Sequence, residues 1–227
     1  MSLFRHAAFV TSVAKFKALP EMGPPEVAFA GRSNAGKSSA INTLVAHTRL
    51  AFVSKTPGRT QLINYFRMAN GAYLVDLPGY GYAKVPEKVR LEWQDLLEKY
   101  LTRRQSLVGL VLIMDSRHPL KDLDKQMIEW FAPSARPIHV LLTKCDKLSR
   151  GEAAATLLAV KKAVEPFGGQ VTVQLFSSLK KIGMEEVEQV LAPWFGDQSG
   201  ENLEGDDAEA TKEGPPVKGE ETGGRTP

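Results

Sequence analysis

The sequence predicts an α/β fold in which a mostly parallel sheet lies between two layers of helices. Short runs rich in apolar and β-branched residues recur along the chain, at residues 26–31, 72–79, 109–115, 137–146 and 171–178. Near-continuous apolar runs are typical of parallel strands, because helices cover both faces of a parallel sheet. Most of these runs are separated by stretches with helical periodicity, an alternation that predicts a doubly wound sheet.

One further strand is predicted to run antiparallel to the others. Residues 62–69 (LINYFRMA) alternate in a different way, and Asn70-Gly71 follows them. This dipeptide is strongly favoured in two-residue hairpin turns. We therefore expect an antiparallel edge strand paired with residues 72–76, and about six strands in the sheet.

Helical periodicity places five helices between and after the predicted strands. The second of them has Pro86 in its first turn and apolar residues at core spacing. The predicted helices cover residues 36–47, 86–103, 122–131, 149–165 and 184–195.

Composition is that of a soluble globular protein, with 43% hydrophobic and 24% charged residues in 227. The length suits one large domain and a tail. No apolar run approaches the ~20 residues that a membrane-spanning helix needs, and the N-terminus lacks the features of a signal peptide. Cys145 is the sole cysteine, which excludes an internal disulfide and favours the reducing cytoplasm.

Charge is divided unevenly along the chain. Residues 197–227 hold nine acidic and three basic residues, whereas residues 1–196 hold 17 acidic and 26 basic residues. We predict an N-terminal extension packed on the domain (1–24), the globular domain itself (25–196) and a disordered acidic tail (197–227), which is too poor in apolar residues to offset the entropy of ordering. A basic domain suits a polyanionic partner such as RNA, although charge alone is equally compatible with a solvated surface that has no specific partner.

A phosphate-binding loop is predicted at residues 31–38. The segment GRSNAGKS matches GxxxxGK[ST], and it lies between a predicted strand and a predicted helix. Glycines let the backbone N–H groups turn toward phosphate, and the helix N-terminus adds positive potential. We expect Lys37 to reach the β- and γ-phosphates and the Ser38 hydroxyl to bind Mg²⁺. The fold is therefore predicted to be a three-layer P-loop NTPase of the Ras-like type.

A second phosphate motif is predicted where the strand before the 86–103 helix ends. In the segment DLPG, we expect Asp76 to hold Mg²⁺ through its hydration shell and the Gly79 amide to bond the γ-phosphate. A switch threonine that completes the Mg²⁺ shell is expected in the segment SKTPGRTQLIN. Thr56 and Thr60 both qualify, and Thr60 is favoured because it lies nearer the following strand.

The segment TKCD (143–146) predicts which nucleotide base the site recognises. A carboxylate at Asp146 can accept hydrogen bonds from guanine N1 and from its 2-amino group, donors that adenine does not offer there. Lys144 is expected to lie across the base, and Cys145 to be a neutral packing residue. At the end of the last strand, the backbone of Ser177 and Ser178 is positioned to contact guanine O6.

The motifs together resemble the EngB family of bacterial GTPases, also called YihA or YsxC, within the TRAFAC class of translation-factor-like P-loop GTPases. The likeness covers residues 5–195 and rests on GRSNAGKSS, TPGRTQLINYF, DLPGYGYA, DSRHPLKDLD, TKCDKL and FSSLKKIG. It implies Mg²⁺-dependent GTP binding, slow GTP hydrolysis, a role in assembly of the large ribosomal subunit, and a requirement in normal cell division and septation. It also places the switch threonine at Thr60.

Motifs and resemblance together predict the site residues. Lys37, Thr60 and Gly79 are expected to act in catalysis, and Ser38 and Thr60 to bind the metal. The predicted nucleotide-binding set is Gly31, Arg32, Ser33, Asn34, Ala35, Gly36, Lys37, Ser38, Ser39, Gly58, Arg59, Thr60, Gln61, Leu62, Asp76, Leu77, Pro78, Gly79, Thr143, Lys144, Cys145, Asp146, Phe176, Ser177 and Ser178.

Two residues bear on how the γ-phosphate is cleaved. Tyr80 follows DLPG where Ras-like enzymes carry the glutamine that orients the attacking water, so intrinsic hydrolysis is expected to be slow. Asn34 lies where potassium-activated GTPases carry an asparagine ligand. K⁺ bound there would offset charge that develops at the β–γ bridge. The alternative is that Asn34 only stabilises the loop by local hydrogen bonds, and the sequence leaves both open.

A contact face for RNA is predicted around the switch segments. Basic residues cluster there, and three tyrosines accompany them. An ordinary solvated surface with some of the aromatics in the core is the competing interpretation. The residues concerned are Lys55, Arg59, Arg67, Lys84, Lys88, Arg90, Tyr65, Tyr80 and Tyr82.

These observations predict a monomeric, cytoplasmic GTPase that acts as a nucleotide-gated assembly factor on large-subunit ribosomal RNA and proteins. The alternative is a nucleotide-gated interaction module of the division machinery in which hydrolysis is incidental. An ATP-dependent kinase is disfavoured by TKCD and by the lack of a recognisable lid or acceptor site.

Overall fold

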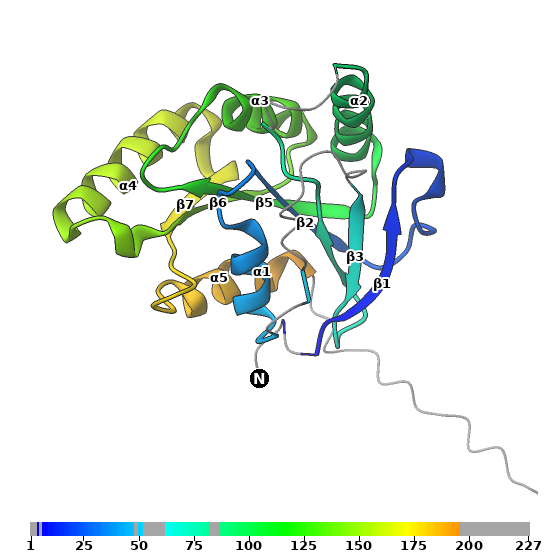
Figure 1. Cartoon of the computed structure of the whole chain (residues 1–227), viewed down its shortest axis with the longest axis horizontal. Coiled ribbons are helices and arrows are strands. Elements are labelled where there is room, and N and C mark those ends of the chain that lie inside the picture. The colour runs from blue at the N-terminus through cyan, green and yellow to red at the C-terminus, as the bar shows by residue number, and fades with distance from the viewer. Residues whose placement is uncertain (1–3, 5, 48–49, 52–61, 82–86, 196–227) are drawn as a thin grey trace, which may run out of the picture.

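The computed structural model describes residues 4, 6–47, 50–51, 62–81 and 87–195, and in this part of the chain a seven-stranded sheet lies between two layers of helices (Figure 1). The strands are β1 (Ala8–Val13), β2 (Glu26–Gly31), β3 (Ile63–Arg67), β4 (Tyr73–Asp76), β5 (Leu107–Asp115), β6 (Ile138–Thr143) and β7 (Val171–Leu175). The helices are α1 (Lys37–Leu44), α2 (Glu87–Arg103), α3 (Asp122–Phe131), α4 (Arg150–Val164) and α5 (Met184–Leu191). A 3₁₀ turn, Ala192–Phe195, extends α5.

The strand order is β1-β3-β4-β2-β5-β6-β7. Strand β3 is antiparallel to both of its neighbours, and the other neighbouring pairs are parallel, so β3 alone runs against the rest. This confirms the predicted mostly parallel sheet with one antiparallel member, between helical layers.

The prediction that residues 62–69 form an edge strand is wrong, because β1 pairs with the outer side of β3. The predicted N-terminal extension thus contributes a seventh strand to the sheet. Most of its side chains are exposed, and its register shifts between Phe9 and Thr11. A strand held mainly by backbone pairing at an edge leaves little apolar alternation in its sequence, which is why the pattern did not reveal it.

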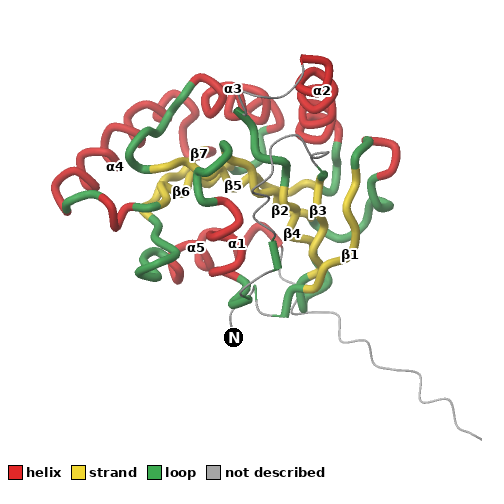
Figure 2. Tube along the Cα trace, viewed as in Figure 1, coloured by secondary structure: helices red, strands yellow, loops and turns green. Residues whose placement is uncertain are grey.

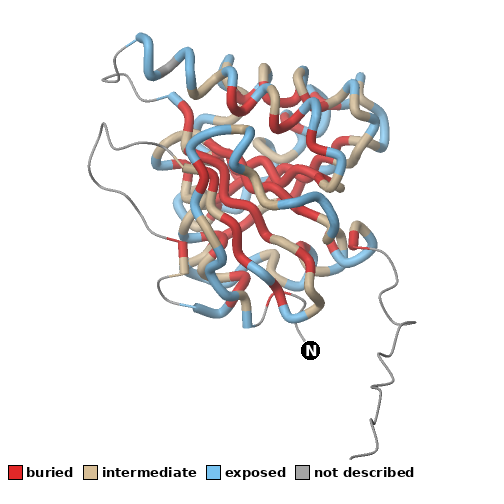
Figure 3. The backbone as a smooth tube through the Cα atoms, turned by 90° about the vertical axis from the view of Figure 1, so that its right-hand side faces the viewer, coloured by how far each residue is buried: buried red, intermediate tan, exposed pale blue. Residues whose placement is uncertain are grey.

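The helices divide between the two faces of the sheet (Figure 2). Helices α2, α3 and α4 pack on one face, and α1 and α5 pack on the other. In β5, Leu110 and Leu112 face the first layer, whereas Val111 and Ile113 face the second. All six residues of β2 are buried, and Figure 3 shows buried backbone running through the middle of the molecule.

A buried carboxylate fixes the end of α2 against the sheet. Glu26 opens β2 and is 1% exposed, and its side chain pairs with Arg104. The hydroxyls of Tyr65 and Tyr100 donate to the other carboxylate oxygen, over 3.2 and 2.8 Å. Burial holds the pKa of Tyr100 well above its ordinary value, so this phenol stays a neutral donor. The cluster joins β2, β3 and the segment after α2.

A second buried polar cluster supports the loop that precedes α5. The His139 ring lies 2.7 Å from both the Thr172 hydroxyl and the side-chain oxygen of Gln174. The Gln174 amide in turn donates to the carbonyl of Gly183, the residue before α5, over 2.8 Å. Burial disfavours the charged imidazolium and lowers the pKa of His139 to about 4.

The His139 cluster predicts a loss of stability in mild acid. The unfolded chain binds a proton near pH 6.5 and the folded chain only near pH 4, so unfolding is favoured as the pH falls through this window. The free energy of unfolding should drop by up to about 3 kcal/mol from this residue. His139→Gln should flatten that part of the pH profile in urea titrations at several pH values between 4 and 7. An unchanged profile in the variant would contradict the assignment.

Candidate nucleotide-binding site

Five predicted motif segments meet at one edge of the sheet. The phosphate loop follows β2, DLPG begins at the last residue of β4, and Asp115 ends β5. Thr143 ends β6, and residues 176–178 follow β7. These strands are parallel, so their carboxyl ends lie on the same side of the sheet (Figure 1). In open α/β sheets, this edge is where ligands bind.

The phosphate loop is shaped by left-handed backbone and by close packing. Asn34 and Gly36 have φ angles of 64° and 97°, and α1 begins at Lys37 directly afterwards. Gly31 leaves β2 so close to β5 that a Cβ atom there would lie 2.8 Å from the carbonyl oxygen of Ile113. Glycine is therefore required at Gly31 on steric grounds and favoured at Gly36 by conformation.

Lys37 and Asp76 form an ion pair between the first residue of α1 and the last residue of β4. Their side chains are 10% and 6% exposed. The side-chain amide nitrogen of Asn64, in β3, lies 3.5 Å from the second carboxylate oxygen of Asp76. The carboxylate therefore faces a cation at the point where the two phosphate motifs meet.

The predicted base loop is joined to the phosphate loop by two side chains. Lys144 has a φ of 59°, and its ammonium donates to the carbonyl of Asn34 over 2.6 Å and to Asp115 over 2.9 Å. The hydroxyl of Thr143 donates to the carbonyl of Ala35. Nucleotide contacts at the two loops would therefore be held in a fixed relation.

The carboxylate of Asp146 is oriented by the loop that follows β7. The Ser177 hydroxyl donates to Oδ1 over 2.6 Å, and it accepts from the backbone N–H of Lys180 over 3.1 Å. The sequence predicted only a backbone role for Ser177, so this side-chain bond was missed. Cys145 is buried, and burial together with Asp146 raises the pKa of its thiol, which favours packing over redox chemistry.

Asp115 is a residue that the sequence did not single out for the site. Its carboxylate accepts from Lys144 and from Arg117, the latter over 2.9 and 2.7 Å. Partial burial raises the pKa of Asp115, but these hydrogen bonds outweigh that effect and hold the pKa well below its usual range. Asp115 therefore remains a carboxylate that anchors Lys144.

Tyr80 is turned into the core. Its hydroxyl donates to the buried carboxylate of Asp124 in α3 over 2.8 Å, and its ring packs at a tilt against Trp93 in α2. Its backbone N–H donates to Gly31, and its carbonyl accepts from Ser33 over 2.8 Å. The tyrosine therefore fixes the segment after DLPG against the phosphate loop, and its phenol is engaged with Asp124.

Comparison with known proteins places these motifs in a family. A family model described as a 50S ribosome-binding GTPase matches residues 26–144. A probable GTP-binding protein EngB of Aromatoleum aromaticum is 71% identical over 196 residues, which span 86% of this chain and 91% of that protein. A protein of the same description from Dechloromonas aromatica is 55% identical over 221 residues, or 96% and 97% of the two chains.

The chain belongs to the EngB family. It is accordingly a GTP-binding GTPase with the P-loop fold. A crystal structure of a probable GTP-binding protein engB aligns with a TM-score of 0.62 at 19% identity, over 75% of this chain and 98% of that one. Era in complex with MgGDPNP and 16S ribosomal RNA aligns with a TM-score of 0.59 at 20% identity, over 82% and 61%. Both likenesses concern the fold.

The structure describes most, but not all, of the residues expected in an EngB nucleotide site. Gly58, Arg59, Thr60 and Gln61 lie outside the described residues, as does the alternative switch residue Thr56. Leu62 is half-buried directly before β3, and Leu77 is buried after β4. The remaining predicted residues lie at the strand ends of the common edge, in the loops that follow them, or in the first turn of α1. Their roles toward nucleotide and metal stay predictions.

The predicted RNA-contact face is wrong for two of its three tyrosines. Tyr65 and Tyr80 are both buried, and their hydroxyls donate hydrogen bonds to the buried carboxylates of Glu26 and Asp124. Arg67 and Lys88 are exposed. The other members, Lys55, Arg59, Lys84, Tyr82 and the Arg90 side chain, lie outside the described residues.

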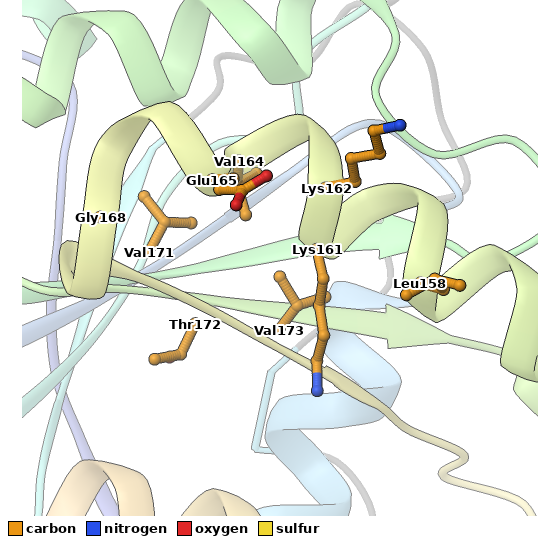
Figure 4. Close-up of a pocket in the computed structure, with 9 residues that line it drawn as sticks. All are labelled: Leu158, Lys161, Lys162, Val164, Glu165, Gly168, Val171, Thr172 and Val173. Atoms are coloured by element: carbon orange, nitrogen blue, oxygen red, sulfur yellow. The ribbon is translucent and has the colours of Figure 1, made fainter.

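A separate hollow of about 650 Å³ lies between α4 and β7, lined among others by Leu158, Lys161 and Val173 (Figure 4). None of its lining residues belongs to the nucleotide motifs. Phosphate loops bind phosphate through backbone N–H groups on an open edge, so a deep hollow is not required for the site.

None of the helices in the described ranges has both the length and the apolar character needed to cross a bilayer.

Asp115 provides a test of how Lys144 is held. Asp115→Asn should weaken binding of GDP and of a non-hydrolysable GTP analogue alike, by about threefold to tenfold, because Lys144 loses a charged partner that is partly exposed. Asp95→Asn removes the same charge from an exposed pair in α2 and is the matched control. Titration with fluorescent nucleotides measures both. A loss confined to the GTP analogue would contradict this role.

Proposed function

We propose that this chain is a Mg²⁺-dependent GTPase switch that assists assembly of the large ribosomal subunit, with a linked requirement in cell division and septation. The observation that carries the proposal is the match of residues 26–144 to a family model described as a 50S ribosome-binding GTPase. That range runs from the strand before the phosphate loop to the lysine of the base loop. We further propose a cytoplasmic monomer.

The residues at the sheet edge have assignable roles toward GTP. Lys37 would exchange the carboxylate of Asp76 for the β- and γ-phosphates, and the N–H groups at the start of α1 would receive phosphate oxygens. Asp146 would accept from guanine N1 and the 2-amino group, and the hydroxyl of Ser177 would hold its carboxylate in place. Selection of guanine over adenine follows from those two donors.

The residues present fit Mg²⁺. Ser38 offers a hydroxyl oxygen in the first turn of α1, and the Asp76 carboxylate already faces the ammonium of Lys37. Mg²⁺ prefers oxygen ligands and keeps several waters, so Ser38 would bind it directly and Asp76 through water. Thr60 is the further proposed ligand, outside the described residues. When bound, Mg²⁺ neutralises charge on the β- and γ-phosphate oxygens.

Hydrolysis without assistance is proposed to be slow. The residue after DLPG has its side chain buried against Asp124, so it does not supply the water-orienting group that Ras-like enzymes place there. A partner, a cation or another segment of the chain has to provide that function. GTP would then persist until the chain meets its partner, which suits a switch.

Asn34 allows the K⁺ hypothesis to be separated from a purely structural role. Its φ of 64° is one that asparagine tolerates better than most residues, which gives the structural alternative a physical basis. If K⁺ binds there, hydrolysis should be faster in KCl than in NaCl at equal ionic strength. Asn34→Gly keeps the backbone conformation and should abolish the difference while GDP binding persists. Equal rates in both salts would reject K⁺ activation.

The proposed ribosomal partner can be tested by co-sedimentation. The chain bound to a GTP analogue should sediment with 50S subunits or their precursors, and the GDP form should not. Lys88→Glu, at an exposed position in the first turn of α2, should weaken that binding at fixed salt because it replaces a phosphate-compatible charge. Lys162→Glu, at an exposed position in α4, is the matched control.

The alternative function is an interaction module of the division machinery with incidental hydrolysis. It predicts that sedimentation with 50S particles does not depend on the nucleotide. It also predicts that depletion of the protein causes no accumulation of immature large subunits. Either result would count against the assembly role, whereas competition by ATP as well as GTP would count against guanine recognition at Asp146.

A further inference from the structure

Ser33, in the middle of the phosphate loop, carries a buried hydroxyl with no hydrogen-bond partner among the described residues. Its Oγ atom is buried, and it is one of four such side-chain atoms in the described part of the chain. The other three, in Trp93, Ser106 and Ser116, lie outside the phosphate loop. Leaving a buried polar group unpaired is unfavourable by about 1–3 kcal/mol, so such groups call for an explanation.

The hydroxyl of Ser33 lies at the junction of the two phosphate motifs. A Cβ atom added to Gly79 would lie 3.4 Å from Ser33 Oγ, so the hydroxyl lies beside Gly79. Gly79 is the residue whose amide the DLPG motif leads us to expect on the γ-phosphate. The Ser33 hydroxyl is therefore at the γ-phosphate end of the loop, away from the base loop that Lys144 joins at Asn34.

The loop does not need this hydroxyl for its shape. The backbone N–H of Ser33 donates to Tyr80 over 2.8 Å, and that of Ala35 donates to Arg32 over 3.0 Å. The left-handed turns at Asn34 and Gly36 complete the loop. Since main-chain bonds account for the conformation, the donor capacity of the Ser33 hydroxyl remains available to a ligand.

We propose that the Ser33 hydroxyl donates a hydrogen bond to the γ-phosphate of GTP and thereby makes the chain discriminate the triphosphate from the diphosphate. The inference rests on the proposed nucleotide site and deepens it. A γ-phosphate oxygen is a charged acceptor, and bonds of this kind are about twice as strong as neutral ones. GDP has no group at this position, so its affinity does not depend on Ser33.

The test compares two nucleotides in one variant. Ser33→Ala should weaken binding of a non-hydrolysable GTP analogue by about tenfold or more and leave GDP affinity unchanged. Ser33→Thr retains the hydroxyl and should restore most of the discrimination. Ser33→Gly removes the hydroxyl without adding bulk, and it should reproduce the alanine result even if alanine disturbs the loop.

Ser116→Ala is the matched control, because it removes another buried, unpartnered serine hydroxyl that lies beyond the end of β5. It should leave the ratio of GTP-analogue to GDP affinity as in the wild type. Equal weakening of both nucleotides by Ser33→Ala, or no change in either, would overturn the proposal. Failure of the wild-type chain to bind GTP at all would instead reject the proposed function, so the two failures are distinguishable.

Discussion

The candidate site depends on the bonds between the base loop and the phosphate loop. Thr143 and Ala35 lie 108 residues apart, yet the hydroxyl of one donates to the carbonyl of the other, and Lys144 makes a parallel bond to Asn34. A nucleotide bound at both loops, as we propose, would span this junction. The distance between its base and its phosphates is fixed by the ligand itself, so the protein gains affinity by holding the two loops ready at that separation.

Around this junction, three of the predicted ligand-binding side chains are each supported by a neighbour from a different strand end. Asp115 anchors Lys144, Ser177 orients Asp146, and Asp76 holds Lys37. The supporting residues come from β5, the loop after β7, and β4. Because the strands are parallel, their ends meet, and residues far apart in sequence brace one another. Such support limits the orientations that a flexible lysine or carboxylate samples before the ligand arrives.

The sequence allowed prediction of whatever is local. The apolar runs, the Asn-Gly turn and the glycine-rich loop each predicted an element, because buried parallel strands and phosphate loops impose their composition directly. It did not reveal β1, whose exposed strand is held by backbone pairing, or the supports supplied by Asp115 and Ser177. These contacts depend on which strand ends meet in space, and a pattern of neighbouring residues does not show that. The burial of Tyr65 was hidden for the same reason, since its partner Glu26 lies 39 residues away.

Tyr80 shows how one position changes its task when its side chain changes. In Ras-like enzymes a glutamine at this position orients the attacking water. Here the tyrosine hydroxyl donates to a buried carboxylate in α3, and its backbone N–H and carbonyl both bond the phosphate loop. Compared with glutamine, the tyrosine offers no water-orienting amide, but it fixes the segment after DLPG against α3 and the phosphate loop. With Tyr80 fixed, Gly79 stays against Ser33, whose buried hydroxyl is the donor that we propose for the third phosphate. Under the proposed function, this one constraint would account both for slow intrinsic hydrolysis and for a donor placed to recognise the triphosphate, which is the property that a switch needs first.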